Sequence, residues 1–388
     1  MPIPQTSNCG RSSATLLTLV AALISLTVTA TSSFAATVLY NDKVVEVEKT
    51  LADVNDLWVQ PQDLTRINGF ELKPEGACLE DICIPIVQSG DNDIVIHRNQ
   101  QKWFSVTGFA KKLGQMYVSD SDTNTWSFGQ IPLRRESFLN KAMAPEFELK
   151  DRKGNTVKLS DFRGKKVFLV TWASWCGCRL DVPVWDRIYK QVQDKNVVFI
   201  VAAQDAGGEA AAGKYYDAVQ PEPSYIAIID EHHTISSLYN FVNVPSGAWI
   251  DEEGHIVRIN EGTYSQRHGP IGTDDYTPAL LDWIEKGADS KYVWDAETVA
   301  KKITPRTPEK EQAEPAFKLG SYFHSKNNNA KADHYWGMAQ ELNPDSWNYF
   351  REELSYTEEG SMGESFRNKR REWQQQGKSY YAPLGLEE

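Results

Sequence analysis

Two cysteines separated by one glycine are the side chains of this sequence best suited to chemistry. Cys176 and Cys178 flank Gly177 and follow residues 167–170, an apolar run that predicts a buried strand. Residues 180–192, which come after them, predict a helix. The start of a helix stabilises a thiolate, which is the reactive form of cysteine. The pair therefore predicts a redox-active dithiol at a strand-to-helix junction.

The one-residue spacing of the two cysteines constrains the bond that they can form. Redox pairs usually have two intervening residues, whereas only Gly177 separates these two. Because disulfide geometry is specific, a bridge across one residue requires a tight turn, and glycine permits the backbone angles of such a turn. We expect this bridge to be strained, easy to reduce and therefore oxidising.

Alternating strand and helix patterns surround the cysteines and must hold them in place. Apolar runs predict further strands at 197–202, 225–229, 248–251 and 255–259, and a last helix at 276–286. Alternation of this kind predicts an α/β domain whose central sheet has helices on both faces. We assign this central domain to residues 141–286.

Several separated motifs of the central domain resemble, in the same order, those of the TlpA/ResA branch of the thioredoxin superfamily, within the redoxin (AhpC/TSA) group. These motifs are APEF at 144–147, LSDFRGK at 159–165, WASWCG at 172–177, Val244-Pro245 and IDEEG at 250–254. The resemblance implies a thioredoxin-like fold and an exported thiol–disulfide oxidoreductase that acts on protein thiols or disulfides. It implies no organic cofactor and no metal.

The resemblance also assigns roles to particular residues. Cys176 matches the nucleophilic cysteine, Cys178 takes the resolving role, and Pro245 matches the cis-proline beside them. We expect Cys176 to be exposed and to have a lowered pKa. From the residues themselves, Trp172 and Trp175 are expected either to bind a partner peptide or to shield the thiols, and Val244 is assigned to substrate binding. The chain departs from the family's Trp-Cys-Gly-Pro-Cys-Arg pattern, because the proline between the cysteines is missing.

Three other functions remain open at this point. A peroxiredoxin-like peroxidase needs a proline and a threonine or serine where this chain has Leu169 and Ala173. A copper-binding thioredoxin-like chaperone would use the two cysteines and a histidine. The available histidines are His232, His233, His255 and His268, of which we interpret the adjacent His232 and His233 as a solvated pair. A redox-silent interaction scaffold is the third alternative.

The first 35 residues have the pattern of a secretory signal peptide. Arg11 precedes an apolar stretch at 16–30, and Ser33-Phe34-Ala35 supplies small residues at the cleavage site. We predict cleavage near Ala35 and a periplasmic or otherwise extracytoplasmic location; an uncleaved membrane anchor is the alternative.

Residues 37–135 predict a small α+β module that carries two further cysteines. Hairpins are expected at 38–47 and 78–86, and a helix at 103–113. Cys78 and Cys83 face each other across the second hairpin, which suits a structural disulfide in an oxidising compartment. A second redox centre or half of a metal site is the alternative, with His97 as the closest histidine.

Residues 313–360 predict an α-helical segment that resembles one tetratricopeptide (TPR) repeat of roughly 34 residues. A lone repeat cannot bury its apolar faces, so we expect it to dock against the thioredoxin-like domain or against a second subunit. Its expected role is structural and partner-binding, with no catalytic residue, followed after Asn348 by a capping helix and a loose tail. A chain cut after about Thr304 should then retain a foldable redoxin core.

Chain length limits the number of domains, and net charge limits the classes of function. With 388 residues the chain is long enough for about two or three domains. Its net charge of −12 argues against a nucleic-acid binder, which usually presents a basic face.

Overall fold

A computed structural model describes residues 34–80, 82–266, 275–303 and 306–386. The predicted signal segment lies outside these residues except for Phe34 and Ala35, which begin strand β1 (Phe34–Tyr40). His268 lies outside them as well. Among the described helices, none combines the length and the apolar character that a membrane span requires.

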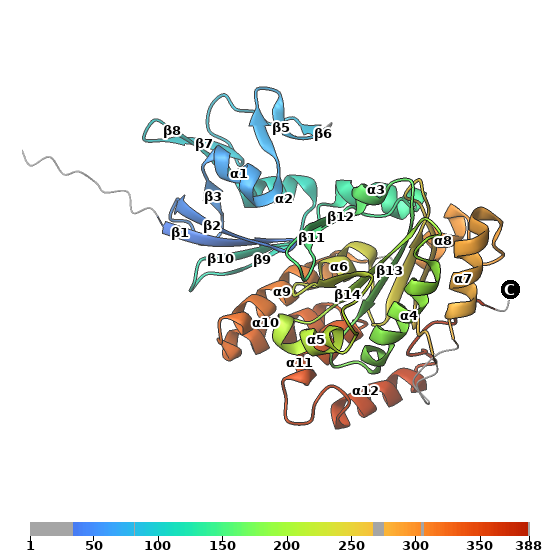
Figure 1. The fold of residues 1–388 in the computed structure, drawn as a ribbon. Helices are drawn as coiled ribbons and strands as arrows, with labels where there is room; N and C mark the ends of the chain where they lie inside the picture. The colour runs from blue at the N-terminus through green and yellow to red at the C-terminus, as the bar shows by residue number, and fades with distance from the viewer. Residues whose placement is uncertain (1–33, 81, 267–274, 304–305, 387–388) are drawn as a thin grey trace, which may run out of the picture. The chain divides into compact units, whose positions relative to one another are not determined.

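A five-stranded sheet forms the centre of the α/β domain (Figure 1). Its strands, in spatial order, are β15 (Ile226–Ile229), β14 (Val197–Ala203), β13 (Lys166–Trp172), β16 (Ser246–Ile250) and β17 (Ile256–Glu261). The pairs β15–β14 and β14–β13 are parallel, whereas β16 and β17 are antiparallel to their neighbours. All five strands lie where the sequence predicts them, so the α/β class of this domain is confirmed.

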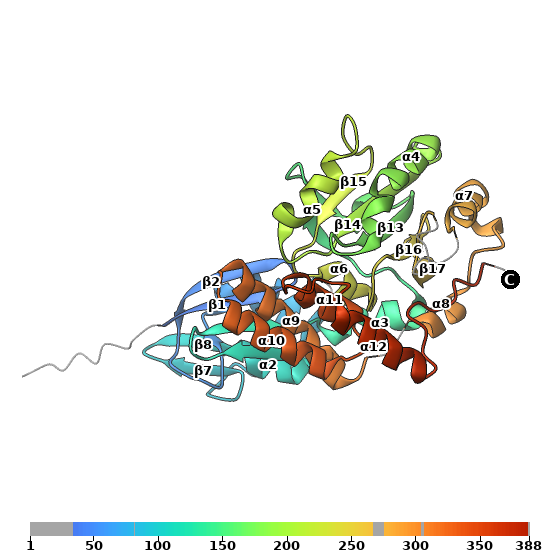
Figure 2. The same ribbon diagram turned by 90° about the horizontal axis from the view of Figure 1, so that it is seen from below.

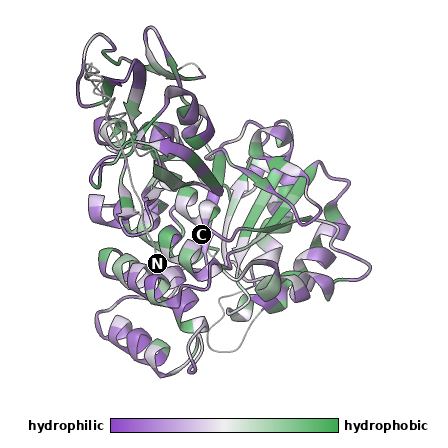
Figure 3. Cartoon of the chain, turned by 90° about the vertical axis from the view of Figure 1, so that its left-hand side faces the viewer, coloured by the Kyte–Doolittle hydropathy of each residue, from purple (hydrophilic) through white to green (hydrophobic). Residues whose placement is uncertain are grey.

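Side chains that alternate along β13 give the sheet two buried faces. Phe168 and Val170 point into one cluster with α4 (Val182–Val192), α5 (Gly208–Asp217) and α7 (Thr277–Lys286). Val167 and Leu169 point into the other, with α6 (Thr234–Tyr239) and α8 (Ala296–Lys302). Burial on both faces explains why these strands are continuous apolar runs, which are green in Figure 3.

The described residues of the N-terminal part form three small sheets and three helices. Its sheets have the orders β2-β1-β10-β9, β3-β8-β7 and β4-β5-β6. The strands are β1, β2 (Lys43–Thr50), β3 (Trp58–Val59), β4 (Glu71–Lys73), β5 (Gly76–Leu79), β6 (Ile82–Ile84), β7 (Val95–Arg98), β8 (Gln101–Ser105), β9 (Tyr117–Asp120) and β10 (Thr125–Phe128). The helices are α1 (Pro61–Asn68), α2 (Val106–Leu113) and α3 (Pro132–Lys141), and a small hairpin of β11 (Glu148–Lys150) and β12 (Thr156–Lys158) follows.

One sequence-based helix boundary in this part was wrong, and one helix was not predicted. The helix predicted at 103–113 begins only at Val106, because Ser105 caps it by accepting a hydrogen bond from the Gly108 backbone N–H at 2.7 Å. Trp103 consequently belongs to strand β8. The module boundary at 135 falls inside α3, a helix that the sequence did not predict.

Cys78 and Cys83 are directly opposite each other on β5 and β6, and their sulfurs are bonded in a disulfide. Together with Glu75 they form the one group of candidate metal ligands among the described residues. Sulfurs that are bonded to each other are not thiolate ligands, so this group does not make a metal site.

The C-terminal part is helical. Its helices are α9 (Pro308–Ser325), α10 (Asn329–Leu342), α11 (Trp347–Ser355) and α12 (Glu364–Gln375), of which α9 and α10 lie side by side (Figure 2). Gly320 permits this close contact, because a Cβ there would lie 2.5 Å from Trp336.

The α9–α10 pair packs on the chain's own β-sheet. Phe317 and Trp336 share a buried cluster with Leu39 of β1 and Val118 of β9, and the Lys318 ammonium donates to the Phe128 carbonyl at 3.1 Å. The sequence therefore predicted correctly that these helices dock, but most of the docking surface is the N-terminal sheet, and the thioredoxin-like domain contributes Ala206 to the cluster.

The loose tail predicted after Asn348 was wrong. Tyr380, Tyr381 and Leu384 are buried and share the apolar cluster of Cys176 and Cys178. Their aromatic and aliphatic side chains supply the apolar area that holds this segment down.

Candidate active site

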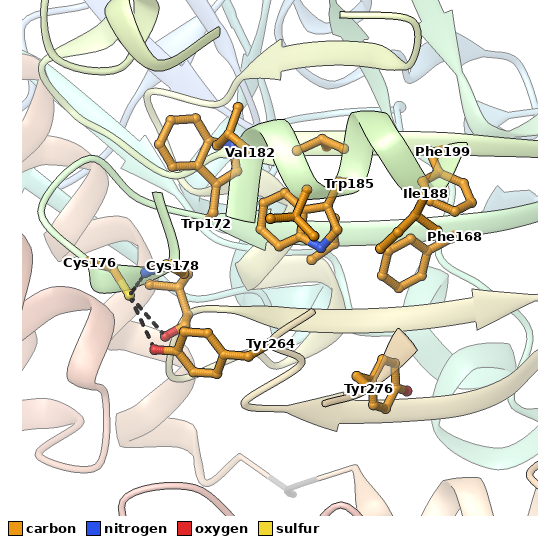
Figure 4. Packing of buried hydrophobic residues seen from close by; sticks show 14 of the residues in the cluster. Phe168, Trp172, Cys176, Cys178, Val182, Trp185, Ile188, Phe199, Tyr264 and Tyr276 are labelled. Atoms are coloured by element: carbon orange, nitrogen blue, oxygen red, sulfur yellow. Dashed lines mark hydrogen bonds between the residues drawn. The ribbon is translucent and has the colours of Figure 1, made fainter. Parts of the chain in front are cut away.

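Cys176 lies where β13 gives way to a helix, as the sequence predicts. It is the N-cap of a short 3-10 helix (Gly177–Asp181) that leads directly into α4. The Cys178 backbone N–H donates to Cys176 Sγ at 3.3 Å, which is the interaction expected of a thiolate at a helix start (Figure 4).

Val244 and Pro245 lie against the sulfur of Cys176. The Val244–Pro245 peptide bond is cis. The Val244 carbonyl oxygen is 3.6 Å from Cys176 Sγ, and the Tyr264 hydroxyl is 3.8 Å from it. The structure thus brings Cys176, Cys178, Val244 and Pro245 together from segments about 70 residues apart in the sequence.

Both cysteines are free thiols and both are buried, which contradicts the expectation that Cys176 is exposed. Cys176 is 1% exposed and Cys178 is fully enclosed. The C-terminal segment supplies the cover, since the Tyr381 hydroxyl donates to the Val244 carbonyl at 2.7 Å and lies 3.0 Å from the Tyr264 hydroxyl. A macromolecular disulfide can reach Cys176 only when this cover moves.

The two thiols differ in acidity. Burial by itself raises the pKa of Cys176, but hydrogen bonding from Cys178 and the charge of Arg351 outweigh it and lower the pKa to about 6. Burial raises the pKa of Cys178 well above its usual range, and the neighbouring Cys176 raises it further. Near neutral pH Cys176 is therefore the thiolate of the pair, and Cys178 carries the proton.

A charged side chain of α11 lies behind the redox loop. Arg351 is buried, donates from Nη2 to the Trp175 carbonyl at 3.1 Å, and stacks 4.7 Å above the Trp175 ring. Residues 313–360 were not expected to reach the redox loop, and Arg351 brings a buried positive charge to it.

Two buried acids complete this side of the site. Glu352 accepts from Trp175 Nε1 at 2.6 Å and from the Ala206 backbone N–H at 2.9 Å. Asp205 accepts from the Ser174 backbone N–H at 2.9 Å. Burial raises the pKa of Asp205 well above its usual range, and the charges of Glu352 and Cys176 add to this.

The described candidate histidines do not lie beside Cys176 and Cys178. His233 is fully buried 3.4 Å from the Glu352 carboxylate, and burial lowers the pKa of His232 to about 4. The interpretation of His232 and His233 as a solvated pair was therefore wrong. His255 lies on the surface beside Asp251. Among the described residues, no histidine lies within ligand distance of both thiols.

The two tryptophans assigned to substrate differ. Trp172 is fully buried and donates from Nε1 to the Tyr216 hydroxyl at 2.9 Å, so this position does not fit a substrate contact. Trp175 is nearly buried but borders an open groove of about 580 Å³ beside the redox loop. Other residues that line this groove are Ser174, Arg179, Lys214, Tyr215, Tyr356 and Met362.

Sequence reasoning missed Tyr264, Arg351, Glu352 and Tyr381. Three of them lie in a C-terminal stretch that reads as polar, and none belongs to a local motif. One available signal was the Tyr380-Tyr381 pair, because adjacent aromatic residues are unusual in a solvated tail.

Residues 139–272 match the Redoxin family. The chain is 30% identical over 148 residues to the thioredoxin-like protein YneN of Bacillus subtilis (strain 168), a match that covers 37% of this chain and 84% of YneN. It is 32% identical over 124 residues to the thiol-disulfide oxidoreductase ResA of Geobacillus kaustophilus (strain HTA426), covering 32% of this chain and 70% of ResA. This chain belongs to the redoxin family of thioredoxin-like oxidoreductases.

The redoxin match contains both central cysteines, Pro245 and Tyr264, whereas Arg351 and Tyr381 lie beyond it. Among solved structures, a thiol:disulfide interchange protein DsbE from Chlorobium tepidum aligns at 30% identity. That alignment covers 29% of this chain and 79% of the other, with a TM-score of 0.27.

Proposed function

We propose that this protein is an exported thiol–disulfide oxidoreductase in which Cys176 attacks and Cys178 resolves. The observation that carries the proposal is the environment of Cys176: a helix-capping thiol with a pKa lowered to about 6, beside the Val244–Pro245 cis peptide. Related proteins named thiol-disulfide oxidoreductases support the same chemistry.

The reaction exchanges two electrons. The Cys176 thiolate attacks one sulfur of a substrate disulfide, forms a mixed disulfide and releases the other substrate sulfur as a thiolate. Cys178 then attacks Cys176 Sγ, which releases the second substrate sulfur. The Cys178 proton and one proton from solvent complete the two substrate thiols. The products are a substrate dithiol and a Cys176–Cys178 disulfide, and the reverse sequence oxidises a substrate.

The proposed substrates are protein thiols or disulfides. The groove beside Trp175 lies next to the redox loop and supports an approach from that side. Access of a substrate to Cys176 also requires displacement of Tyr381, whose hydroxyl donates a hydrogen bond to the Val244 carbonyl. A protein substrate has enough surface to offset the loss of such contacts, whereas a small disulfide does not.

No contact or distance among the described residues favours the peroxidase or the copper-binding alternative. Leu169 and Ala173 are buried apolar residues at the positions where a peroxidase needs proline and a hydroxyl. The copper-binding alternative uses the two cysteines and a histidine, and no described histidine lies within ligand distance of both thiols.

The proposal also includes the domain division and the location. We propose a signal peptide at 1–35, an α+β module from 37 to about 135, the redoxin domain at 141–286 and a TPR-like appendage at 313–360. Cleavage near Ala35 would leave most of β1 intact, since that strand continues to Tyr40. The inner face of α9 and α10 is covered within the chain, so a protein partner of the appendage would use the opposite face.

Replacing the resolving cysteine should trap the intermediate. In Cys178→Ser the mixed disulfide between Cys176 and a substrate cannot be released by the second attack, and it should accumulate several-fold over the wild type. Non-reducing electrophoresis with peptide mapping measures it. Trapping through Cys78 or Cys83, or an equal yield in Cys176→Ser, would contradict the assigned roles.

A further inference from the structure

The guanidinium of Arg351 is buried and is hydrogen-bonded to uncharged acceptors. Each of its three nitrogens donates one hydrogen bond: Nη2 to the Trp175 carbonyl at 3.1 Å, Nη1 to the Tyr380 hydroxyl at 2.9 Å and Nε to the Ser361 carbonyl at 3.3 Å. All three acceptors are neutral, and within the described part of the chain no carboxylate forms an ion pair with Arg351.

Such an arrangement is costly unless a negative charge lies close by. Removing a cation from water costs several kcal/mol, and buried charges in proteins are ordinarily paired. The buried arginine Arg135 obeys this rule, because it binds the Glu311 carboxylate at 2.6 Å. Arg351 instead binds the backbone carbonyl of the residue directly before Cys176.

We propose that the Cys176 thiolate is the counter-charge of Arg351, so that helix α11 completes the redox site from outside the redoxin region. Arg351 is then a positioning residue: it fixes the redox loop through the Trp175 carbonyl and supplies the positive charge that favours ionised Cys176. This inference rests on the proposed function, because it assumes that the thiolate is the working state of Cys176.

The other groups around Cys176 do not replace this charge. The Tyr264 hydroxyl and the Cys178 backbone N–H contact Cys176 Sγ, the Tyr381 hydroxyl lies beside that of Tyr264, and the Tyr380 hydroxyl accepts from Arg351. Burial raises the pKa values of the Cys178 thiol and of these three hydroxyls, so all four are neutral near pH 7. Asp205 and Glu352 lie on the Trp175 side and, being acids, supply no positive charge.

One further cation lies nearby. Arg179 donates to the Cys176 carbonyl at 2.9 Å, but its guanidinium also lies against the Tyr215 ring at the groove. Because Arg179 borders solvent, its charge is screened more than that of Arg351.

The test is the ionisation of Cys176 in the full-length protein, measured by thiolate ultraviolet absorbance and by the alkylation rate against pH. In Arg351→Met the midpoint should rise by roughly 1–3 pH units from the wild-type value, the usual effect of one nearby opposite charge. Arg351→Lys keeps the charge and should raise it less. Arg135→Met removes an equally buried arginine and should leave the midpoint unchanged.

An unchanged midpoint in a folded Arg351→Met protein would overturn the inference. Both readouts report the thiolate and need no exchange activity, so a protein with a low midpoint but no exchange would refute only the proposed function. A midpoint that rises equally in Arg135→Met would show a general packing effect and would also overturn the inference.

If Arg351→Met does not fold, thermal unfolding of the wild type and of Cys176→Ala across pH provides the test. A folded-state pKa near 6 lies below the ordinary value of about 8.5. The thiolate therefore stabilises the fold fully above about pH 8.5, and this contribution disappears as the pH falls through 6. The wild type's advantage in melting temperature should grow with pH, and a constant difference would overturn the inference.

Discussion

Replacing Cys176 with serine is expected to reduce disulfide exchange by more than about a thousandfold, because the variant lacks the only low-pKa nucleophile of the proposed site. The serine hydroxyl is not ionised near neutral pH and forms no disulfide. The reduction of a protein disulfide followed by a fluorescence or turbidity assay measures the loss. Circular dichroism should remain native, since the two side chains are close in size.

The matched control removes the other cysteines. The double variant Cys78→Ser, Cys83→Ser should retain exchange activity and lose about 2 kcal/mol of unfolding free energy, because its disulfide closes a loop only a few residues long. Activity that survives Cys176→Ser but disappears in this control would place the redox centre in the N-terminal part and refute the proposed function.

Ending the chain at Lys378 is expected to raise the alkylation rate of Cys176 at least about tenfold. The deletion removes Tyr380, Tyr381 and Leu384, which are buried in the same cluster as the thiol. Burying one such side chain contributes about 1.5–3 kcal/mol, and about 1.4 kcal/mol corresponds to a tenfold change in the population of an open state. In the wild type, alkylation of Cys176 requires local opening of this segment, and the truncated chain does not need that step.

The rates should be compared near pH 9, at which Cys176 is ionised in both proteins and only access differs. Tyr381→Phe is the graded control: it keeps the ring but loses the hydrogen bond to the Val244 carbonyl, so its effect should be smaller. An alkylation rate in the truncated chain equal to that of the wild type would mean that another element limits access.

The fold of the central domain was predictable because it follows from local sequence patterns. Strands such as β13 and β14 are buried on both faces, so each appears as an unbroken apolar run between turns. The position of Cys176 at the strand-to-helix junction and the pairing of Cys78 with Cys83 across a hairpin follow from the same local patterns.

The environment of Cys176 was not predictable in the same way. Arg351 is 176 positions from the Trp175 carbonyl that it binds, and Tyr381 is 137 positions from the Val244 carbonyl. No periodicity or spacing encodes such contacts, because they depend on how whole elements pack. The burial of Cys176 and the participation of α11 in the site therefore emerged only with the structure.

The same distinction between local patterns and distant contacts applies to the C-terminal helices. The TPR-like pattern predicts amphipathic helices that need a cover, and Phe317 and Trp336 do lie against β-strand residues. The pattern contains no information about α11, whose Trp347 and Leu354 join the apolar cluster around the thiols. Cutting the chain after about Thr304 would therefore remove part of the site's core along with Arg351.

The reduction potential of the Cys176–Cys178 pair tests the central claim most directly. Equilibration of the full-length protein with glutathione buffers, followed by peptide mapping, should show a two-electron transition that links these two cysteines. A thiolate with a pKa lowered to about 6 stabilises the reduced form, so the potential should lie above that of thioredoxin, about −270 mV, and below that of DsbA, about −120 mV. Cys176 and Cys178 that remain free thiols at every potential, while only Cys78–Cys83 changes state, would contradict the account.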